Sequence, residues 1–306
     1  MTRSRTKASG WYAEPGPLTR VERHAERLAD LPADIDELCR VVQGLIVHVA
    51  WAPAYGLDRA TLREHEVQTR TAQAMLDRML ALDSTDLAKA REPARRMVGN
   101  CRHFATFTTA VLRAHGVPAR ARCGFGAYFL PGHLEDHWVV EFIDPVSGEW
   151  RLCDSQIDDL QRAKLQPAFD TTAVPRDQFR VAGDVWLACR SGDVDPENCG
   201  IFDMHGLWFV QANVVRDLAA LNKHELLPWD DWGLAEQDIG GSDAGPTLAR
   251  LDQVAGLTAS PDTELDALRA LYVADDLRVP QVLRSFKDGG AVNEAWDDSG
   301  LEAWRD

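Results

Sequence analysis

One cysteine of this chain stands where a helix is expected to begin. Cys101 follows Gly99 and Asn100, and asparagine is a favoured N-cap residue, so Cys101 takes the first helical position. Unpaired backbone N–H groups and the positive end of the helix dipole meet there and stabilise a thiolate. The same N–H groups can hold an oxyanion formed on an attacked carbonyl. We therefore expect Cys101 to be a nucleophile toward carbonyl carbon.

We expect a base and an orienting carboxylate on two successive strands. His137 opens the predicted strand 137–143, and Asp154 ends the next predicted strand, 149–154. A loop over residues 144–147 would join them as an antiparallel hairpin and set His137 directly opposite Asp154. Directly opposed residues share a face with Cβ atoms about 5 Å apart, which lets a carboxylate orient an imidazole. The same register predicts three further opposed pairs: Ile143 with Gly148, Val139 with Leu152, and Glu141 with Trp150.

The segment that begins with Cys101 has the apolar spacing of a buried helix. Its core-facing residues recur at intervals of three and four: Phe104, Phe107, Thr108, Val111, Leu112 and His115. Gly116, followed closely by Pro118, marks the end of this helix. Short strands are predicted next, at 119–129 and then in the hairpin. A helix followed by a sheet predicts an α+β core.

Helices are also predicted on both sides of this core. Apolar periodicity marks four of them, near residues 38–49, 58–81, 207–221 and 264–273. A stretch rich in Gly, 240–246, predicts a linker. The predicted organisation is a disordered lead-in at 1–18, a catalytic domain at 19–239 with its core at 99–156, and an acidic helical appendage at 247–306.

Four ordered runs of the sequence resemble the core of the transglutaminase-like superfamily. The runs are Gly99–Phe104, Leu112–Arg120, Asp136–Val139 and Trp150–Asp154. In that family a Cys at the start of a helix, a His that opens a strand and an Asp that ends the next strand form a papain-like triad, in this order. The resemblance implies Cys101 as nucleophile, His137 as general base and acid, and Asp154 as the group that orients His137. It also implies a papain-like core, in which the nucleophile helix packs on an antiparallel sheet, with helical additions at both ends.

The sequence departs from the family pattern beside two of these residues. Trp138 follows His137 directly, where many relatives have a small residue before the aromatic. Ser155 follows Asp154, where many relatives have proline. Nothing resembles the extra β-domains of the animal calcium-dependent enzymes. These departures bear on which substrate the protein uses and on whether it depends on calcium, more than on the identity of the triad.

The resemblance implies cysteine-dependent acyl transfer. The Cys101 thiolate would attack an amide or ester carbonyl and form a thioester, while His137 protonates the leaving group. Water as the second nucleophile gives an amidase or peptidase, and an amine gives an amide-forming acyltransferase; the sequence does not choose between them. The alternative is a catalytically silent binding module of the same fold, although silent relatives usually lose a triad residue.

Several further site residues are candidates by residue type. Gln43 and Trp51 have the donor chemistry of a second oxyanion group, although each could be an ordinary packing or capping residue. The substrate-binding candidates are Arg102, Arg122 and Asp136. Arg120 could bind a substrate carboxylate in the same way, but strand and helix arginines more often pair with local acids.

Other histidines and cysteines have plainer interpretations. His103 and His115 are expected to be structural, and His133, on a loop, is a weaker rival to His137 as the base. Cys123 and Cys153 are expected to be buried packing residues. A metal site built from Cys101, Cys123, Cys153 and His137 lacks zinc-ligand spacing, so we predict no metal.

The composition and net charge of the chain limit the kinds of molecule that it is expected to bind. A net charge of −15 argues against nucleic acid, because phosphate binding needs clustered Lys and Arg. No apolar run is long enough to span a bilayer, and the first residues lack the apolar stretch of a secretory signal, so we expect a cytoplasmic protein without membrane contact. The six cysteines include no CxxC pair. The expected partner is a small-molecule, peptide or protein acyl substrate; no cofactor is required, and the oligomeric state stays open.

Overall fold

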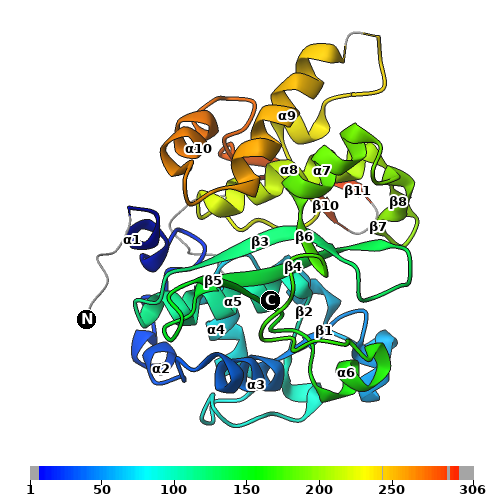
Figure 1. The fold of residues 1–306 in the computed structure, drawn as a ribbon. Helices are drawn as coiled ribbons and strands as arrows, with labels where there is room; N and C mark the ends of the chain where they lie inside the picture. The colour runs from blue at the N-terminus through cyan, green and yellow to red at the C-terminus, as the bar shows by residue number, and fades with distance from the viewer. Residues whose placement is uncertain (1–6, 243, 288–289, 296–306) are drawn as a thin grey trace. The chain divides into compact units, whose positions relative to one another are not determined.

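A computed structural model describes residues 7–242, 244–287 and 290–295 (Figure 1). The chain folds into two compact units, and each unit combines segments that are distant in sequence. Among the described residues, the first unit comprises 7–8, Arg122–Trp138 and those between 175 and 295. The second unit comprises Ser9–Ala121 and Val139–Val174. The linker predicted at 240–246 therefore falls inside the first unit.

The helices of the second unit include the predicted helix that begins at Cys101 and parts of the two predicted near residues 38–49 and 58–81. Their bounds are α1 (Lys7–Ala13), α2 (Ala25–Ala29), α3 (Ile35–Leu45), α4 (Ala72–Leu82), α5 (Cys101–Ala114) and α6 (Asp159–Leu165). Helix α1 corrects the prediction of a disordered lead-in for residues 7–18, because Tyr12 and Leu18 are fully buried. Residues 1–6 of that lead-in lie outside the described residues.

Two predicted helices of the second unit are shorter than their apolar spacing suggested. Helix α3 ends at Leu45, and the chain continues as β1 (Ile46–His48), which pairs in parallel with β2 (Met97–Gly99). The predicted helix 58–81 forms only from Ala72 onward. Three 3-10 helices precede it, at Ala52–Tyr55, Arg59–Thr61 and Glu64–Gln68. Side-chain caps explain this break, because Asp58 accepts from the Ala60 N–H and Thr71 accepts from the Ala74 N–H.

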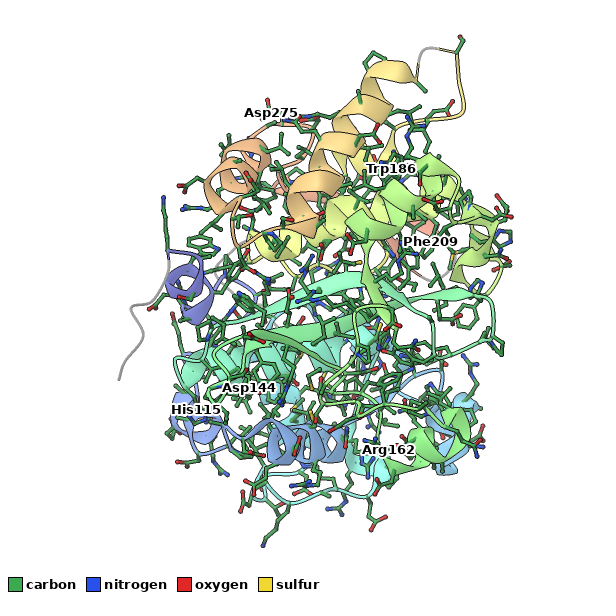
Figure 2. All side chains as sticks on the ribbon, in the orientation of Figure 1. His115, Asp144, Arg162, Trp186, Phe209 and Asp275 are labelled. Carbon is green, nitrogen blue, oxygen red and sulfur yellow. The ribbon has the colours of Figure 1, made fainter. Side chains whose placement is uncertain are left out.

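The central strands are β3 (Ala119–Gly126), β4 (Leu134–Ile143) and β5 (Trp150–Cys153). The predicted hairpin between β4 and β5 forms, but its register was wrong by two residues: Ile143 opposes Trp150, and Glu141 opposes Leu152. The loop lies one residue further along the chain than predicted, because the carboxylate of Asp144, labelled in Figure 2, accepts from the Val146 N–H at 2.7 Å. The Asp144 N–H donates to the Glu149 carbonyl at 2.9 Å.

The corrected register changes which residue is expected opposite Asp154. Its continuation places Val139, not His137, opposite Asp154. A shift of two residues keeps the same side chains on each face, because side chains alternate along a strand. His137, Val139 and Glu141 therefore still share one face of β4.

The described residues of the first unit include the remaining strands of the main sheet and the helices α7 to α10. The main sheet has the order β6-β3-β4-β7-β8, with β5 paired to β4. The additional strands are β6 (Phe179–Val181), β7 (Cys199–Ile201) and β8 (Met204–His205). The helices are α7 (Ala182–Ser191), α8 (Leu207–Leu221), α9 (Gly245–Ala259) and α10 (Leu265–Tyr272). The bounds of α8 are those that its apolar periodicity predicts.

The segment predicted as a helical appendage is only partly helical. Helices α9 and α10 occupy its first half, but β10 (Val282–Lys287) and β11 (Gly290–Ala295) follow as an antiparallel pair. Strand β10 also pairs with β9 (Asp230–Asp231). Residues 288–289 and 296–306 of the predicted appendage lie outside the described residues.

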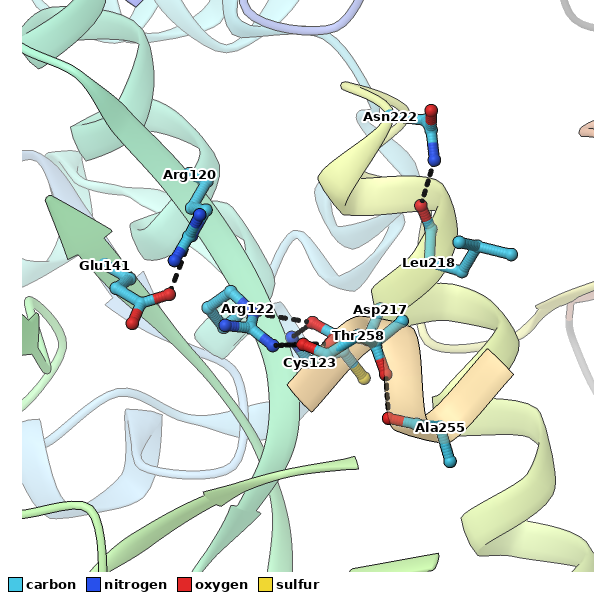
Figure 3. Close-up of polar contacts among 9 residues, drawn as sticks. All are labelled: Arg120, Arg122, Cys123, Glu141, Asp217, Leu218, Asn222, Ala255 and Thr258. Atoms are coloured by element: carbon cyan, nitrogen blue, oxygen red, sulfur yellow. Dashed lines mark hydrogen bonds and ion pairs between the residues drawn. The ribbon is translucent and has the colours of Figure 1, made fainter. Parts of the chain in front are cut away.

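Two buried arginines of β3 are neutralised by carboxylates (Figure 3). In the second unit, the Arg120 Nε donates to Glu141 at 2.7 Å, and the guanidinium lies 3.9 Å from the Trp150 ring centroid. In the first unit, Arg122 donates to both carboxylate oxygens of Asp217, at 3.1 and 2.9 Å. All four charged side chains are almost fully buried. Each arginine thus finds its counter-charge inside its own unit.

Within the described part of the chain, we find no helix that has both the length and the apolar character needed to cross a membrane.

Candidate active site

The nucleophile candidate lies at a capped helix start. Cys101 is the first residue of α5, after the N-cap residue Asn100, and only 7% of Cys101 is exposed. The Asn100 N–H donates to the His103 Nδ1 at 3.1 Å. The Asn100 and His103 side chains also lie within hydrogen-bond distance of one another. Burial, with the nearby Arg102 cation, holds the pKa of His103 well below its usual range. His103 is therefore a structural cap, as predicted.

The backbone before Cys101 is tightly packed. The Gly99 carbonyl accepts from the Val49 N–H at 2.8 Å, which extends the pairing of β1 and β2. A Cβ atom at Gly99 would lie 3.0 Å from the His103 Cβ and 3.0 Å from the Ile46 Cγ2. Only glycine fits here without a shift of the nucleophile helix or of β1.

We expect Gly99→Ala to destabilise the protein by about 1–3 kcal/mol, because the added methyl group overpacks this contact. Gly256→Ala is the matched control, since a Cβ on this α9 glycine meets nothing within 4 Å and alanine favours a helix. Urea unfolding of both variants measures the difference. Equal stability of the two variants would contradict the close approach at Gly99.

A buried carboxylate anchors the strand that leads to Cys101. Glu66 is fully buried, and its Oε1 accepts from Arg63 Nε at 2.7 Å and from Arg78 Nε at 2.7 Å. Its Oε2 accepts from the backbone N–H of Val98, in β2, at 2.7 Å. Glu66 thus fixes β2 close to Cys101.

Arg102 bonds the backbone of a neighbouring segment, and its role in substrate binding stays a prediction. The side chain is fully buried, and its two terminal nitrogens donate to the carbonyls of Thr69 and Arg70, at 3.2 and 2.5 Å. These bonds tie the start of α5 to the segment before α4. Arg102 therefore fixes the start of α5.

The orienting candidate, Asp154, lies directly after β5 and is buried. Its N–H donates to the Thr171 carbonyl at 2.7 Å, and its Oδ1 accepts from the Gln156 N–H at 3.0 Å. These two bonds fix the backbone of Asp154 and one of its carboxylate oxygens.

Gln43 supports the segment after Asp154, and its role as an oxyanion donor stays a prediction. Its Nε2 donates to the carbonyls of Ser155 and Ile157, at 3.3 and 3.2 Å. Both amide hydrogens of Gln43 are therefore used on backbone carbonyls. The other candidate, Trp51, lies half-buried before a 3-10 helix, and its role as an oxyanion donor stays a prediction.

Two thiols meet beside this segment. The sulfur atoms of Cys39, in α3, and Cys153, the last residue of β5, lie 3.3 Å apart, and both side chains are buried. The hydrogen bond with Cys39, together with burial, raises the pKa of the Cys153 thiol well above its usual value. Cys153 is a buried residue, as predicted, and so is Cys123.

His137 lies in β4 among aromatic rings of the first unit. Its ring centroid is 4.8 Å from that of Phe129, 6.0 Å from that of Tyr128 and 6.4 Å from that of Phe179. Only 2% of His137 is exposed. Edge contacts on several sides restrict the rotation of the imidazole. The rival histidine, His133, is more exposed and lies 3.5 Å from the Glu135 carboxylate.

Asp136 is buried next to His137 in sequence and is part of a polar network. Its Oδ1 accepts from the Asn213 Nδ2 at 2.7 Å, and the Asn213 Oδ1 accepts from Arg216 at 3.1 Å. Burial raises the pKa of Asp136 above its usual value. Its predicted role in substrate binding stays a prediction.

Arg122 is paired with Asp217, and its role in substrate binding stays a prediction. Beyond its two bonds to Asp217, its Nη2 donates to the Thr258 carbonyl at 2.8 Å. The same carboxylate accepts from the Cys123 N–H at 2.9 Å. These contacts join β3 to α8 and α9 inside the first unit, so Arg122 serves the fold.

The stretch of chain that contains the candidate catalytic residues also matches the model of a known protein family. Residues 67–155 match the model of the transglutaminase-like superfamily. The chain carries a transglutaminase-like domain. Members of this superfamily share a papain-like fold and generally use cysteine-dependent catalysis. The helices and sheets of the structure agree with the predicted α+β class.

The matched stretch of the transglutaminase-like domain contains Cys101, His137 and Asp154. At a significant level, the chain matches no curated protein and no solved structure. Among the described residues, no group of three or more His, Cys, Asp or Glu side chains is arranged to hold a metal ion.

The sequence did not predict several residues that hold the candidate catalytic residues of the transglutaminase-like domain in place. Glu66, Asn213 and the aromatic neighbours of His137 give no local motif, since their partners lie far along the chain. An aromatic signal was available, because Tyr128 and Phe129 are adjacent and precede His137 by one short loop.

Proposed function

We propose that Cys101 forms a thioester with the acyl group of an amide or ester substrate. The match of residues 67–155 to the transglutaminase-like superfamily supports this proposal, and the position of Cys101 as the first residue of α5 carries it. A helix start presents backbone N–H groups and a positive dipole end, which favour a thiolate over a thiol. His137 is the proposed base and acid, and Asp154 is the proposed orienting carboxylate.

In the proposed reaction, His137 takes the thiol proton and the Cys101 sulfur attacks the carbonyl carbon. The carbonyl electron pair moves to oxygen, where the N–H groups of the first turn of α5 stabilise it. The tetrahedral intermediate then collapses, the bond to the leaving amine or alkoxide breaks, and the imidazolium returns the proton to that group. A thioester on Cys101 remains. Water or an amine resolves it by the same steps in reverse order.

The packing of both partners supports this assignment of roles. The aromatic rings around His137 restrict its plane, and the bonds to Thr171 and Gln156 fix Asp154. A base that is held in one orientation transfers a proton with little loss of entropy. The other candidate histidines have structural partners: His103 bonds Asn100, and His115 bonds the Leu31 carbonyl at 2.8 Å.

Selective alkylation of Cys101 tests the proposal without knowledge of the substrate. Brief exposure to iodoacetamide across pH 5 to 9, with intact-mass and peptide mapping, should label Cys101 below pH 7. His137→Ala should weaken this labelling by tenfold or more, because it removes the proposed acceptor of the Cys101 thiol proton. Labelling of Cys101 only at alkaline pH, unaffected by His137→Ala, would favour the catalytically silent binding module.

The alkylation experiment should be carried out on protein that carries the Cys189→Ser substitution. Hydrogen bonding with Cys199 lowers the pKa of the partly exposed Cys189 thiol, so Cys189 is the expected competitor for the reagent. Cys39 and Cys153 are buried, and the raised pKa of Cys153 keeps it protonated. Selective labelling of Cys101 then justifies a screen of acyl donors. The screen should use water and amines in turn as the second nucleophile.

A further inference from the structure

Two buried cysteines of the second unit lie in contact, although they are distant in the sequence. The sulfur of Cys39, in α3, lies 3.3 Å from the sulfur of Cys153, in β5, and the two residues are 114 positions apart. Both elements are labelled in Figure 1. Both residues are free thiols. A disulfide holds its sulfur atoms about 2.05 Å apart, so the two sulfurs need to approach by only about 1.3 Å, which side-chain rotation can supply.

Strand β5 is held on both sides at Cys153. Cys153 itself pairs with Val140 of β4. On the other side, the Val174 N–H donates to the Leu152 carbonyl at 2.9 Å. The Cys153 side chain is completely buried, and close packing leaves it little room to turn away from α3. Its sulfur is therefore held beside Cys39.

Helix α3 is fixed against the same part of the chain. Gln43 lies four residues after Cys39 and so on the same face of the helix, one turn further along. Its Nε2 donates to the carbonyls of Ser155 and Ile157, at 3.3 and 3.2 Å. Two successive turns of α3 thus contact the segment that starts at Cys153. The contact between the sulfurs is set by the packing of the second unit and not by one flexible side chain.

One of the two sulfurs is accessible to a small molecule. Cys39 is 3% exposed and lines a cavity of about 360 Å³ in the second unit. Hydrogen peroxide fits such a cavity easily, because a water molecule needs only about 10–15 Å³ of comparable volume. Cys153 is completely buried and is not among the residues that line this cavity. A small oxidant therefore reaches Cys39 first.

The hydrogen bond between the two thiols assigns their roles. This bond, together with burial, raises the pKa of the Cys153 thiol well above its usual value. Cys153 therefore keeps its proton and donates it toward Cys39. The Cys39 sulfur accepts, so it is the more nucleophilic sulfur of the pair.

We propose that Cys39 and Cys153 are a site of oxidative modification, which a hydroperoxide converts into a reversible disulfide. First, the Cys39 sulfur attacks the terminal peroxide oxygen, the O–O bond breaks, and the thiol proton passes to the leaving oxygen. The products are a sulfenic acid on Cys39 and either water or an alcohol. The Cys153 sulfur then attacks the Cys39 sulfur, the S–O bond breaks, and the Cys153 proton leaves with the hydroxide as water. Two thiols are oxidised and one hydroperoxide is reduced.

The disulfide would join α3 covalently to the residue directly before Asp154. It links positions that are 114 residues apart, so it restricts the unfolded chain strongly. A dithiol reverses the modification by thiol–disulfide exchange. The modification is independent of acyl transfer at Cys101.

Peptide mapping after oxidation tests the proposal in the full chain. Cys101→Ala combined with Cys189→Ser removes the proposed nucleophile and the partly exposed thiol, so neither can compete for the oxidant. After treatment with hydrogen peroxide and alkylation of the remaining thiols, trypsin should release peptide 28–40 linked to peptide 152–162. Dithiothreitol should separate the two peptides. Absence of the linked peptides, with Cys39 either unmodified or oxidised further to a sulfinic acid, would overturn the proposal.

The wild-type packing and the order of the two steps are tested by controls. The same treatment in concentrated urea should give mixed disulfides among the remaining cysteines, because the native fold no longer selects a partner. On the same double-variant background, Cys153→Ala should leave a sulfenic acid on Cys39 that dimedone labels, whereas Cys39→Ala should leave Cys153 unlabelled. Dimedone on Cys153 but not on Cys39 would overturn the assignment of Cys39 as the attacked thiol.

The melting temperature shows whether the native structure accommodates the bond. The oxidised protein should melt at least about 4 °C above the reduced protein, because the disulfide closes a long loop in the unfolded chain. Cys39→Ala should show no such difference between oxidised and reduced samples. A lower melting temperature once the linked peptides have formed would show that the native packing opposes the bond, and would overturn the proposal.

Discussion

Cys101→Ala is expected to lower kcat by at least about 10³-fold for any acyl donor that the wild-type protein turns over. Removal of a nucleophile eliminates the covalent route and leaves only the oxyanion donors and substrate binding. Release of p-nitrophenol from a panel of activated acyl esters measures the effect. The unfolding free energy should change by less than about 1.5 kcal/mol, because only one small side-chain atom is removed.

Cys189→Ala is the matched control for this experiment. Cys189 is also a free thiol, is partly exposed and lies outside the matched stretch, so its variant should keep wild-type turnover. An alanine variant of Cys101 that retains more than a tenth of the wild-type activity would contradict a thioester at this residue. Activity lost equally in both variants would point to a general effect on folding.

Asp217→Ala is expected to destabilise the protein by about 3–5 kcal/mol. The change leaves the Arg122 guanidinium buried without its carboxylate, and the desolvation of an unpaired charge is costly. It also removes the acceptor of the Cys123 N–H. Urea unfolding, followed by circular dichroism, measures the loss.

A double variant separates the charge from the packing. Arg122→Met with Asp217→Leu removes both charges and keeps apolar volume, so it should recover most of the lost stability. It should remain about 1–3 kcal/mol below the wild type, because the Cys123 N–H still lacks an acceptor. A double variant as unstable as Asp217→Ala would show that the unpaired guanidinium is not the cause.

The helices that the sequence predicts best are those with long buried faces. The bounds of α5 and α8 follow from their apolar spacing, because almost every turn of each is buried. Helix α1 escaped prediction, since its Gly and its neighbouring Pro residues suggest a flexible terminus. Its burial depends on contacts such as that between the Tyr12 and Trp150 rings, whose centroids are 5.7 Å apart. Such distant partners leave no local pattern.

Side-chain chemistry was easier to predict than side-chain partners. Cys101 could be placed at a helix start because capping is local. Arg102 and Gln43 have the donors that a substrate site needs, but both use them on backbone carbonyls of distant segments. The hairpin register was predicted wrongly for a similar reason, because a turn set by Asp144 shifted the pairing by two residues.

The buried arginines of β3 also determine how that strand aligns. All eight residues of β3 are buried, so alternation of apolar and polar side chains cannot distinguish one alignment from its neighbours. Arg120 and Arg122 lie two positions apart, and each meets a carboxylate within its own unit. A slip of β3 by one residue would withdraw both guanidiniums from their counter-charges at the same time. Misaligned chains would thus carry two uncompensated buried charges, which makes the alternative pairings of β3 energetically prohibitive.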